Sequence, residues 1–406
     1  MKNKILMLNT VAGKGSVGRL ITGLSSALKE IGHEPYIAFG RWDAPIGFAS
    51  YRIEKQADII CHGVMSRLTD RHGLYSSKAT RKLIEIIRGA EPDIIHLHNI
   101  HGYYVNYEIL FSFLKSEFTR KGGRVVWTLH DCWSFTGHCV HFEYAGCDRW
   151  KTQCFRCPEK NQYPASLLLD SSRSNYERKR KAFTGVPGLT LVTPSEWLKD
   201  RVKESYLKDY PVEVVPTGID TEQFKPLETH IRERYGIGDK TLLLGVASPW
   251  RERKGFYDFL KLSGEVHGNT VIALVGLNRK QMEEARPHGN IIPVMKTDSV
   301  KELAEWYSAA DYYVNLTLED TFPTTNIEAM ACGTPVITYR SGGSGESLTE
   351  NTGRIVDKGD TGAVLRAVSE LSGIDREEIR RCCLERASEY AMEKRFSQYI
   401  EGVYGL

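Results

Sequence analysis

The chain lacks any long uninterrupted apolar run. No stretch of its 406 residues approaches the roughly 18 apolar residues expected of a membrane-spanning helix, so any membrane association should be peripheral. The apolar run at the start is too short for the core of a signal peptide and leads directly into a Gly-rich turn. We therefore expect a cytoplasmic location.

A strong excess of charge of either sign is also missing. The chain has 54 basic and 51 acidic residues, for a formal net charge of +3, and so lacks the basic bias usual in nucleic-acid-binding proteins. No nucleic-acid partner is expected. Hydrophobic residues make up 41% of the chain and charged residues 26%, as in globular domains. The length exceeds what one core usually organises, so we expect two domains of about 200 residues each.

Cysteine is too scarce for a disulfide scaffold, with nine residues in the whole chain. Five of the nine nevertheless lie between positions 132 and 157, within a segment, 132–165, that we interpret as an insertion. Four of these cysteines have a spacing that predicts a structural zinc site, and the last two form a C-x-x-C pair: Cys139, Cys147, Cys154 and Cys157. Disulfide bonds are the alternative, which the expected reducing compartment disfavours.

Short β-branched runs alternate with amphipathic helical patterns along the chain. This alternation predicts an α/β fold of doubly wound parallel sheets with helices on both faces. Two series of candidate strands indicate domains at 1–222 and 230–388, joined within the polar segment 219–240. The last stretch, 389–406, predicts a helix that either packs on the second domain or crosses back to the first.

The segment LEDTFPTTNIEAMACGTPVI at 318–337 places Asp320 and Glu328 around a loop that runs into a helix. The helix would begin at residues whose free backbone N–H groups suit phosphates: Thr324, Thr325 and Asn326. Glu328, about one turn further on, would reach a pair of ribose hydroxyls. Asp320 alone would also suit a helix cap, but a cap leaves the small residues of AMACGTP unexplained.

This motif resembles the donor-site motif of glycosyltransferase family 4, and the resemblance covers essentially the whole chain. It implies a GT-B fold, in which two Rossmann-like domains face a cleft, and retaining transfer from a nucleotide sugar bound by the second domain. It also implies that Glu328 holds the ribose and that Asp320 lies beside the donor sugar. Asp320 stands where the family usually has Glu, and TFPTT replaces the usual GFG-containing turn, which leaves the donor open. No cofactor for catalysis is implied.

A second match is GVASPWRERKGF at 245–256. It resembles the family element in which an Arg and a Lys neutralise the donor diphosphate, and Lys254 fits the Lys. The family Arg lies six residues earlier, where this chain has Ser248, so Arg251 or Arg253 substitutes for it or the charge is missing. Such cations stabilise the negative charge that develops on a departing diphosphate. The alternative is a solvated basic turn.

Two features of the first half match the family less specifically. The Gly-rich NTVAGKGSVGRL is not a P-loop, although Glu34 follows at a distance that leaves a dinucleotide site open. In family 4 the corresponding loop faces the cleft, which implies donor contacts for Gly15 and Ser16. His130, in TLHD at a strand end, resembles the family histidine that contacts the donor sugar, although a lone strand-end histidine is more often structural.

His96 and His98 alternate onto one strand face, which would suit a metal. The resemblance favours a cleft-lining role for both. The basic run within 173–181 is interpreted as a peripheral contact with anionic lipid, and a solvated helix face is the alternative.

The predicted activity is transfer of a sugar from a nucleoside-diphosphate sugar to a hydroxyl of a lipid-linked glycan in surface polysaccharide assembly. Some bacterial polysaccharide glycosyltransferases resemble the cysteine-bearing segment. Two alternatives stay open: a GT-B nucleotide-sugar epimerase, and a degenerate protein that binds sugar nucleotides without turnover. An NAD-linked dehydrogenase lacks a coherent catalytic set.

Overall fold

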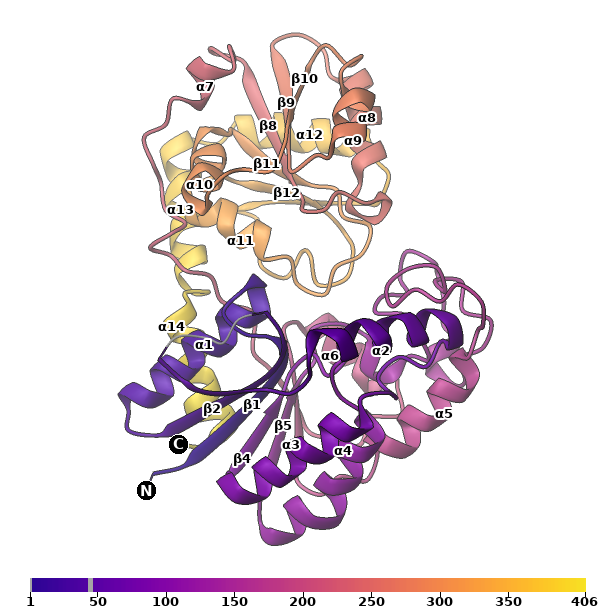
Figure 1. Cartoon of the computed structure of the whole chain (residues 1–406). Helices are drawn as coiled ribbons and strands as arrows, with labels where there is room; N and C mark the ends of the chain where they lie inside the picture. Colours follow the sequence, from indigo (N-terminus) through magenta and orange to yellow (C-terminus); the bar gives the residue numbers. More distant parts are fainter. Residues whose placement is uncertain (1, 43–46) are drawn as a thin grey trace. The chain divides into compact units, whose positions relative to one another are not determined.

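The computed structural model describes residues 2–42 and 47–406 (Figure 1). The chain divides into two compact units, which we call the first unit (Met1–Pro216 with Arg395–Leu406) and the second unit (Thr217–Lys394). The division thus falls at 216/217, just before the polar segment in which the sequence placed it. The last residues belong to the first unit. No helix in the described part of the chain is long and apolar enough to cross a membrane.

Within the described residues, the first unit has a parallel sheet of seven strands in the order β3-β2-β1-β4-β5-β6-β7. Its strands are β1 (Lys4–Val11), β2 (Glu34–Arg41), β3 (Ala49–Arg52), β4 (Ile94–Leu97), β5 (Arg124–Thr128), β6 (Leu189–Thr193) and β7 (Val212–Val214). Helices cover the sheet, so central strands are buried on both faces and are apolar along their length. The helices are α1 (Gly15–Glu30), α2 (Gln56–Thr69), α3 (Ser77–Ala90), α4 (Tyr107–Phe113), α5 (Ser172–Phe183) and α6 (Glu196–Lys203).

The second unit repeats this architecture around a parallel sheet of six described strands, in the order β10-β9-β8-β11-β12-β13. Its strands are β8 (Thr241–Val246), β9 (Thr270–Val275), β10 (Ile291–Val294), β11 (Tyr312–Asn315), β12 (Val336–Tyr339) and β13 (Gly353–Val356). Its helices are α7 (Ile231–Arg234), α8 (Phe256–Glu265), α9 (Arg279–Ala285), α10 (Val300–Ala309), α11 (Thr324–Ala331), α12 (Thr361–Ser372) and α13 (Arg376–Ser388). The predicted α/β fold class is confirmed.

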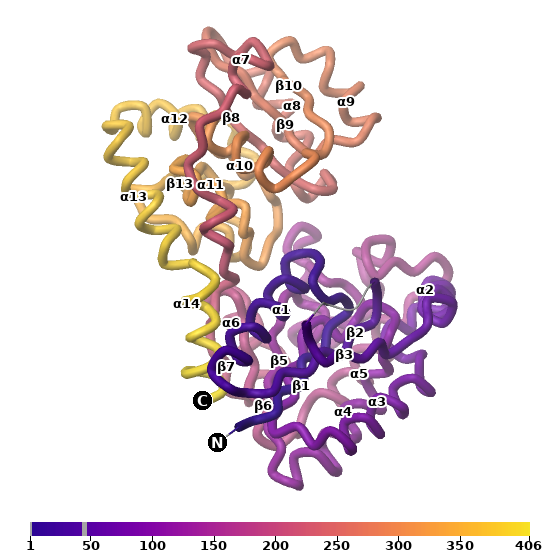
Figure 2. The backbone as a smooth tube through the Cα atoms, turned by 60° about the vertical axis from the view of Figure 1, so that its left-hand side comes forward, coloured from indigo at the N-terminus to yellow at the C-terminus, as the bar shows by residue number. Residues whose placement is uncertain are grey.

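The chain returns to the first unit through α14 (Met392–Ser397) and a π-helical segment, Gln398–Tyr404 (Figure 2). Phe396 packs so closely on α1 that a Cβ at Gly23 would lie 2.4 Å from its ring. The hydroxyl of Tyr404 lies 2.5 Å from Nδ1 of buried His96, and the guanidinium of Arg124 donates to the carbonyl oxygen of Tyr404 at 2.5 Å. Side chains of β4 and β5 therefore hold this segment in place.

Removing the Tyr404 hydroxyl should destabilise the first unit. Tyr404→Phe leaves a buried imidazole nitrogen of His96 without this partner, which should lower the free energy of unfolding by about 1–3 kcal/mol. Urea unfolding measures the change. Tyr257→Phe, at a side chain that is 56% exposed, is the matched control and should leave the unfolding curve unchanged. Equal stability of the two variants would contradict this role for Tyr404.

Candidate functional site

The basic loop of the second unit is fixed to the carboxyl end of β11. The backbone N–H of Leu318 donates to the carbonyl oxygen of Arg253 at 2.8 Å. Gly255 has φ +77°, and a Cβ there would lie 2.1 Å from the carbonyl oxygen of Leu316, so only glycine permits this approach. Loop 251–255, which follows β8, is thereby held against the loop that leads into α11.

This contact brings Lys254 and Asp320 together. Lys254 Nζ lies 2.5 Å from Asp320 Oδ2, and the two side chains are 25% and 18% exposed. The backbone N–H of Phe322 donates to the other carboxylate oxygen at 3.1 Å, which fixes the orientation of the carboxylate. The sequence singled out both charged residues but did not predict that they pair. On the same loop Arg251 is exposed and Arg253 is half-buried.

Glu328 lies on α11 with its carboxylate held on both oxygens. The hydroxyl of Thr324 donates to Oε1 at 3.2 Å, and the hydroxyl of buried Tyr307 donates to Oε2 at 3.1 Å. Burial and the nearby Glu328 carboxylate raise the pKa of Tyr307, so its hydroxyl stays protonated. Thr324 and Thr325 form the first turn of α11, where backbone N–H groups have no partner within the helix. A half-buried carboxylate and a helix N-terminus thus lie one turn apart.

Asn326 makes structural hydrogen bonds within the second unit, which differs from the phosphate contact that the sequence predicted. It is fully buried, its Oδ1 accepts from Asn315 Nδ2 at 2.8 Å, and its Nδ2 donates to the carbonyl oxygen of Ser344 at 2.8 Å. Its backbone N–H donates to Pro323 at 3.2 Å. The prediction that Asn326 offers a free N–H group to phosphate is therefore wrong, because that N–H bonds the carbonyl oxygen of Pro323, while the side chain joins α11 to its own unit.

The sequence reasoning missed the loop after β12. Gly342 has φ +51°, and a Cβ there would lie 1.8 Å from the carbonyl oxygen of Asp320. The N–H of Gly343 donates to that same oxygen at 3.1 Å. The run SGGSGES at 341–347 was the available signal, since closely spaced glycines after a strand indicate a close backbone approach.

In the first unit the Gly-rich loop forms the entry to α1. Gly13 donates its N–H to the carbonyl oxygen of Gly18 at 3.1 Å, and both Gly13 and Gly15 adopt positive φ. Gly15 and Ser16 lie exposed in the first turn of α1. The structure therefore places them at a helix N-terminus, and their contact with the donor stays a prediction.

His130 follows β5 and stacks on His98. Its Nε2 lies 3.1 Å from His98 Nδ1, and the two rings are inclined by 17°. Burial lowers the pKa of His130 to about 4, so its imidazole is neutral at pH 7. A neutral imidazole suits hydrogen bonding to a sugar hydroxyl. His96 is different, because its ring nitrogens contact Tyr404 and Thr128 inside the unit.

The four cysteines of the predicted zinc site lie in the first unit and are free thiols. A hydrogen bond links Cys139 and Cys157, and Cys154 Sγ accepts from the backbone N–H of Gly137 at 3.2 Å. Throughout residues 2–42 and 47–406, no group of three or more His, Cys, Asp or Glu side chains is arranged to hold a metal ion. The thiols as placed do not form a four-ligand site. Structural zinc stays a prediction, which metal analysis of the purified protein would test.

The predicted basic segment 173–181 lies on α5, and one of its basic residues is buried rather than exposed. Lys179 is 1% exposed, and its ammonium donates to the carbonyl oxygens of Trp133 at 2.7 Å and Thr136 at 3.1 Å. The ammonium also lies 3.6 Å from the ring centroid of Trp133. Burial lowers the pKa of Lys179 to about 7. The inclusion of Lys179 in a lipid-facing cluster is therefore wrong, because it packs inside the first unit.

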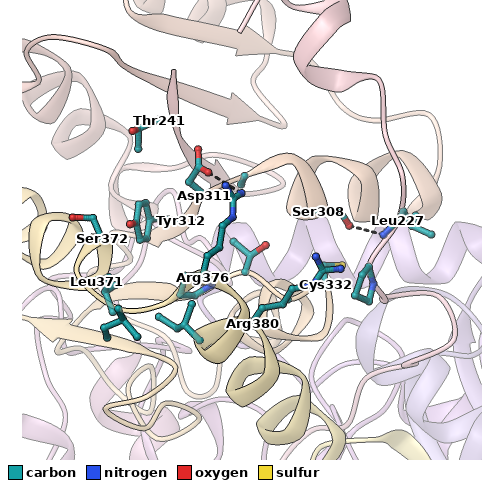
Figure 3. A pocket seen from close by; sticks show the side chains of 17 residues that line it. Leu227, Thr241, Ser308, Asp311, Tyr312, Cys332, Leu371, Ser372, Arg376 and Arg380 are labelled. Carbon is teal, nitrogen blue, oxygen red and sulfur yellow. Dashed lines mark hydrogen bonds and ion pairs between the residues drawn. The ribbon is translucent and has the colours of Figure 1, made fainter. Parts of the chain in front are cut away.

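A cavity of about 270 Å³ in the second unit lies elsewhere (Figure 3). It is lined by residues at the amino ends of β8, β11 and β12, including Thr241 and Tyr312. Asp311 in its wall pairs with Arg376 at 3.0 Å. Because the strands are parallel, this cavity lies at the opposite sheet edge from Lys254 and Asp320 and is not the candidate donor site.

The fold is that of an α/β protein with two parallel sheets, and its second unit groups Lys254, Asp320 and Glu328 beyond the carboxyl ends of its strands. A family model described as Glycosyltransferase Family 4 matches residues 17–223, and one described as Glycosyl transferases group 1 matches residues 240–373. The first match alone covers about half of the chain. The chain belongs to glycosyltransferase family 4, as predicted.

Among curated proteins, the chain is similar to WcaC of Escherichia coli K12, whose name assigns it provisionally to colanic acid biosynthesis. The two are 28% identical over 287 residues, covering 67% of this chain and 66% of WcaC. N-acetyl-alpha-D-glucosaminyl L-malate synthase of Bacillus anthracis is 25% identical over 418 residues, covering 100% of this chain and 95% of that protein. The chain spans about two thirds of WcaC and about half of the D-inositol 3-phosphate glycosyltransferase of Pseudarthrobacter chlorophenolicus.

Two solved structures resemble the whole chain. Anabaena Alr3699/HepE in complex with UDP-glucose has a TM-score of 0.65 at 14% identity, with 100% of both chains covered. Sucrose-phosphate synthase of Thermosynechococcus elongatus has a TM-score of 0.70 at 15% identity, with 100% of this chain and 98% of that chain covered. At such identities the likeness shows the fold, and that fold is GT-B.

Acid should destabilise the first unit. Burial lowers the pKa of His62 and His96 to about 3 and that of His130 to about 4, each from 6.5. Between pH 6.5 and these lowered pKa values, the unfolded chain binds protons that the folded unit does not. The free energy of unfolding is therefore highest above pH 6.5 and decreases as the pH falls. Each such histidine should cost about 1.4 kcal/mol per pH unit in this window.

Urea unfolding in buffers of about pH 7.5, 6 and 5, which begin above the ordinary histidine pKa and end below it, measures this loss. His96→Gln should make the pH dependence shallower, whereas the control His230→Gln, at an exposed histidine of the second unit, should not change it. A free energy of unfolding that stays constant across the three buffers would show that the buried histidines do not govern acid stability.

Proposed function

We propose that this chain transfers a sugar, with retention of anomeric configuration, from a nucleoside-diphosphate sugar to a hydroxyl of a lipid-linked glycan in surface polysaccharide assembly. The observation that carries the proposal is the grouping of Lys254, Asp320, Glu328 and the α11 N-terminus in the second unit. Family membership supports sugar transfer. The likeness to WcaC supports a polysaccharide product, and the HepE complex supports a nucleoside-diphosphate donor.

Glu328 is the proposed ribose ligand. Thr324 and Tyr307 hold its carboxylate in one orientation before any donor arrives, which lowers the entropic cost of binding. Each oxygen of a carboxylate can accept two hydrogen bonds, which suits it to a pair of ribose hydroxyls. The N–H groups of Thr324 and Thr325 lie at the positive end of the α11 dipole and would hold the diphosphate.

Lys254 is the proposed electrostatic catalyst, and Arg251 or Arg253 supplies a further cation. In the structure Asp320 neutralises Lys254 at 2.5 Å. A diphosphate carries more negative charge than one carboxylate, so its arrival would draw the ammonium away and free Asp320 for the hydroxyls of the donor sugar. The ammonium then acts most strongly in the transition state, when charge develops on the leaving oxygen.

The departing phosphate oxygen is the proposed acceptor of the proton from the attacking hydroxyl. No side chain is then required as a general base, and no metal or organic cofactor enters the reaction. His130, Gly15 and Ser16 of the first unit are the proposed sugar- and phosphate-contacting residues of that unit, with the neutral His130 imidazole bonding a sugar hydroxyl.

Glu328→Gln should weaken binding of the nucleoside diphosphate by at least about tenfold, because it removes the charged acceptor of the ribose hydroxyls. The measurement is the thermal shift of the protein across UDP, GDP, ADP and their sugar conjugates. One diphosphate should stabilise the wild type. Glu283→Gln, at an exposed carboxylate on α9, should keep the full shift. The absence of a shift with any of these nucleotides in the wild type would favour the degenerate-site alternative.

Lys254→Met should lower kcat by about 10²-fold or more, because it removes a cation that acts mainly in the transition state. Nucleoside diphosphate release in the presence of a lipid-linked glycan acceptor measures kcat, and NMR of the product determines the anomeric configuration. Lys280→Met, at an exposed lysine on α9, is the control and should be fully active. Conversion of the donor sugar without any acceptor would instead identify an epimerase, and an inverted product would exclude the retaining mechanism.

A further inference from the structure

The cavity at the amino ends of β8, β11 and β12 brings together parts of the second unit that are distant in sequence (Figure 3). Its walls come from these strand ends, from residues 332–334 at the end of α11 and from the first turns of α13. Its volume of about 270 Å³ is close to the lower limit for small-molecule sites. The proposed sugar transfer takes place at the opposite edge of the sheet and does not use this cavity.

Two arginines of α13 line the cavity. Arg376 and Arg380 are four residues apart, which places both on one face of the helix. Figure 3 shows their side chains extending from α13 along the cavity. Guanidinium groups suit bidentate contacts with phosphate oxygens. Among the described residues that line the cavity, Asp311 is the one carboxylate, so its charge decides whether an anion can bind.

The charge of Asp311 is compensated without Arg380. Its Oδ2 accepts from Arg232 at 2.5 Å and from the backbone N–H of Leu242 at 2.8 Å, and its Oδ1 lies 3.0 Å from Arg376 Nη2. Arg232 also donates to three backbone carbonyl oxygens, which fixes it beside Asp311. Since Arg232 alone balances the carboxylate, the two arginines of α13 give the cavity an excess of positive charge.

The stem of Arg380 is held in place while its guanidinium group remains available. A Cβ at Gly333 would lie 2.9 Å from Cγ of Arg380, so the arginine stem crosses the end of α11 where glycine leaves room. Among the described residues, none forms a hydrogen bond or ion pair with its guanidinium group. The hydroxyl-bearing side chains of Thr241 and Tyr312 line the same cavity. This set of groups suits a ligand that carries a phosphate and hydroxyl groups.

Tyr307 connects the wall of the cavity to Glu328. The hydroxyl of Thr334, in the wall, donates to the carbonyl oxygen of Tyr307 at 2.6 Å. The hydroxyl of Tyr307 in turn donates to Oε2 of Glu328 at 3.1 Å. Glu328 also lies on α11, the helix whose end forms part of the wall. A ligand that restrains this wall should therefore restrain the carboxylate that we assign to the ribose.

We propose that this cavity is a regulatory site for a small phosphorylated metabolite, whose phosphate binds Arg376 and Arg380 and whose binding strengthens donor binding at Glu328. The volume suits a sugar phosphate better than a nucleotide. A ligand that orders α13 and the end of α11 reduces the ordering that the donor must impose, which couples the two sites positively. The cavity goes beyond the proposed function, and its coupling to the donor rests on that function.

The test of binding is the thermal shift of the whole protein with mannose 6-phosphate, with mannose and inorganic phosphate as comparison ligands. Mannose 6-phosphate should stabilise the wild type, and mannose should not, because it lacks the phosphate. Equal midpoints for mannose 6-phosphate and inorganic phosphate would show that the hydroxyl groups contribute nothing and would overturn the assignment to a metabolite.

Two neighbouring arginines provide a matched pair of variants. Arg380→Gln should weaken mannose 6-phosphate binding at least about tenfold, and glutamine keeps the carbons that cross Gly333. Arg381→Gln is the control and should bind like the wild type, because Arg381 pairs with Glu385 at 2.9 Å and does not line the cavity. If Arg380→Gln does not fold, Arg376→Gln should show the same loss, since Arg232 still holds Asp311.

Calorimetric titration of the nucleoside diphosphate tests the coupling. Saturating mannose 6-phosphate should tighten nucleoside diphosphate binding about fivefold in the wild type and in Arg381→Gln, but not in Arg380→Gln.

The proposal is overturned if mannose 6-phosphate does not stabilise the wild type, if Arg380→Gln and Arg381→Gln bind it equally, or if nucleoside diphosphate binding is unchanged or weakened. A wild type that binds no nucleoside diphosphate would instead reject the proposed function. The mannose 6-phosphate shifts of the two arginine variants would still decide whether the cavity binds a phosphorylated ligand.

Discussion

The approach of Gly255 to the carbonyl oxygen of Leu316 is the contact on which the candidate site of the second unit depends. Any side chain at position 255 would push the basic loop away from β11 and separate Lys254 from Asp320. The same device recurs where Gly342 meets the carbonyl oxygen of Asp320. Backbone contacts that only glycine allows therefore set the positions of the loops that carry the charged groups.

The functional residues predicted in the two units differ in their charge. The second unit gathers a lysine, two arginines and two carboxylates around one edge of its sheet, an arrangement suited to a diphosphate. The first unit keeps His98 and His130 uncharged, because burial opposes protonation of both rings. Neutral rings hydrogen-bond hydroxyl groups without attracting phosphate. The second unit therefore offers charged side chains at its candidate site, whereas the histidine pair of the first unit offers neutral hydrogen-bonding groups.

Local patterns were enough to predict the fold and much of the candidate site. Alternating strand and helix periods identified both sheets, and Asp320 and Glu328 are positioned by a loop and helix that are contiguous in sequence. Lys179 was misjudged because its partners lie far along the chain, and Asn326 because its N–H bonds Pro323 in the same turn and its side chain turns inward to other elements. Asn326 bonds Asn315 and Ser344, and the ammonium of Lys179 bonds a carbonyl oxygen 46 residues away. Residue type and spacing carry no information about such tertiary partners.

The return of the chain to the first unit has a consequence for how the protein is made. Residues 395–404 complete the packing around His96 and Gly23, yet they are synthesised after the whole of the second unit. During synthesis, the amino-terminal sheet is therefore made without these contacts, and some 180 further residues are added before they can form. Domains usually fold in the order of their synthesis, but here the domain begun first is finished last.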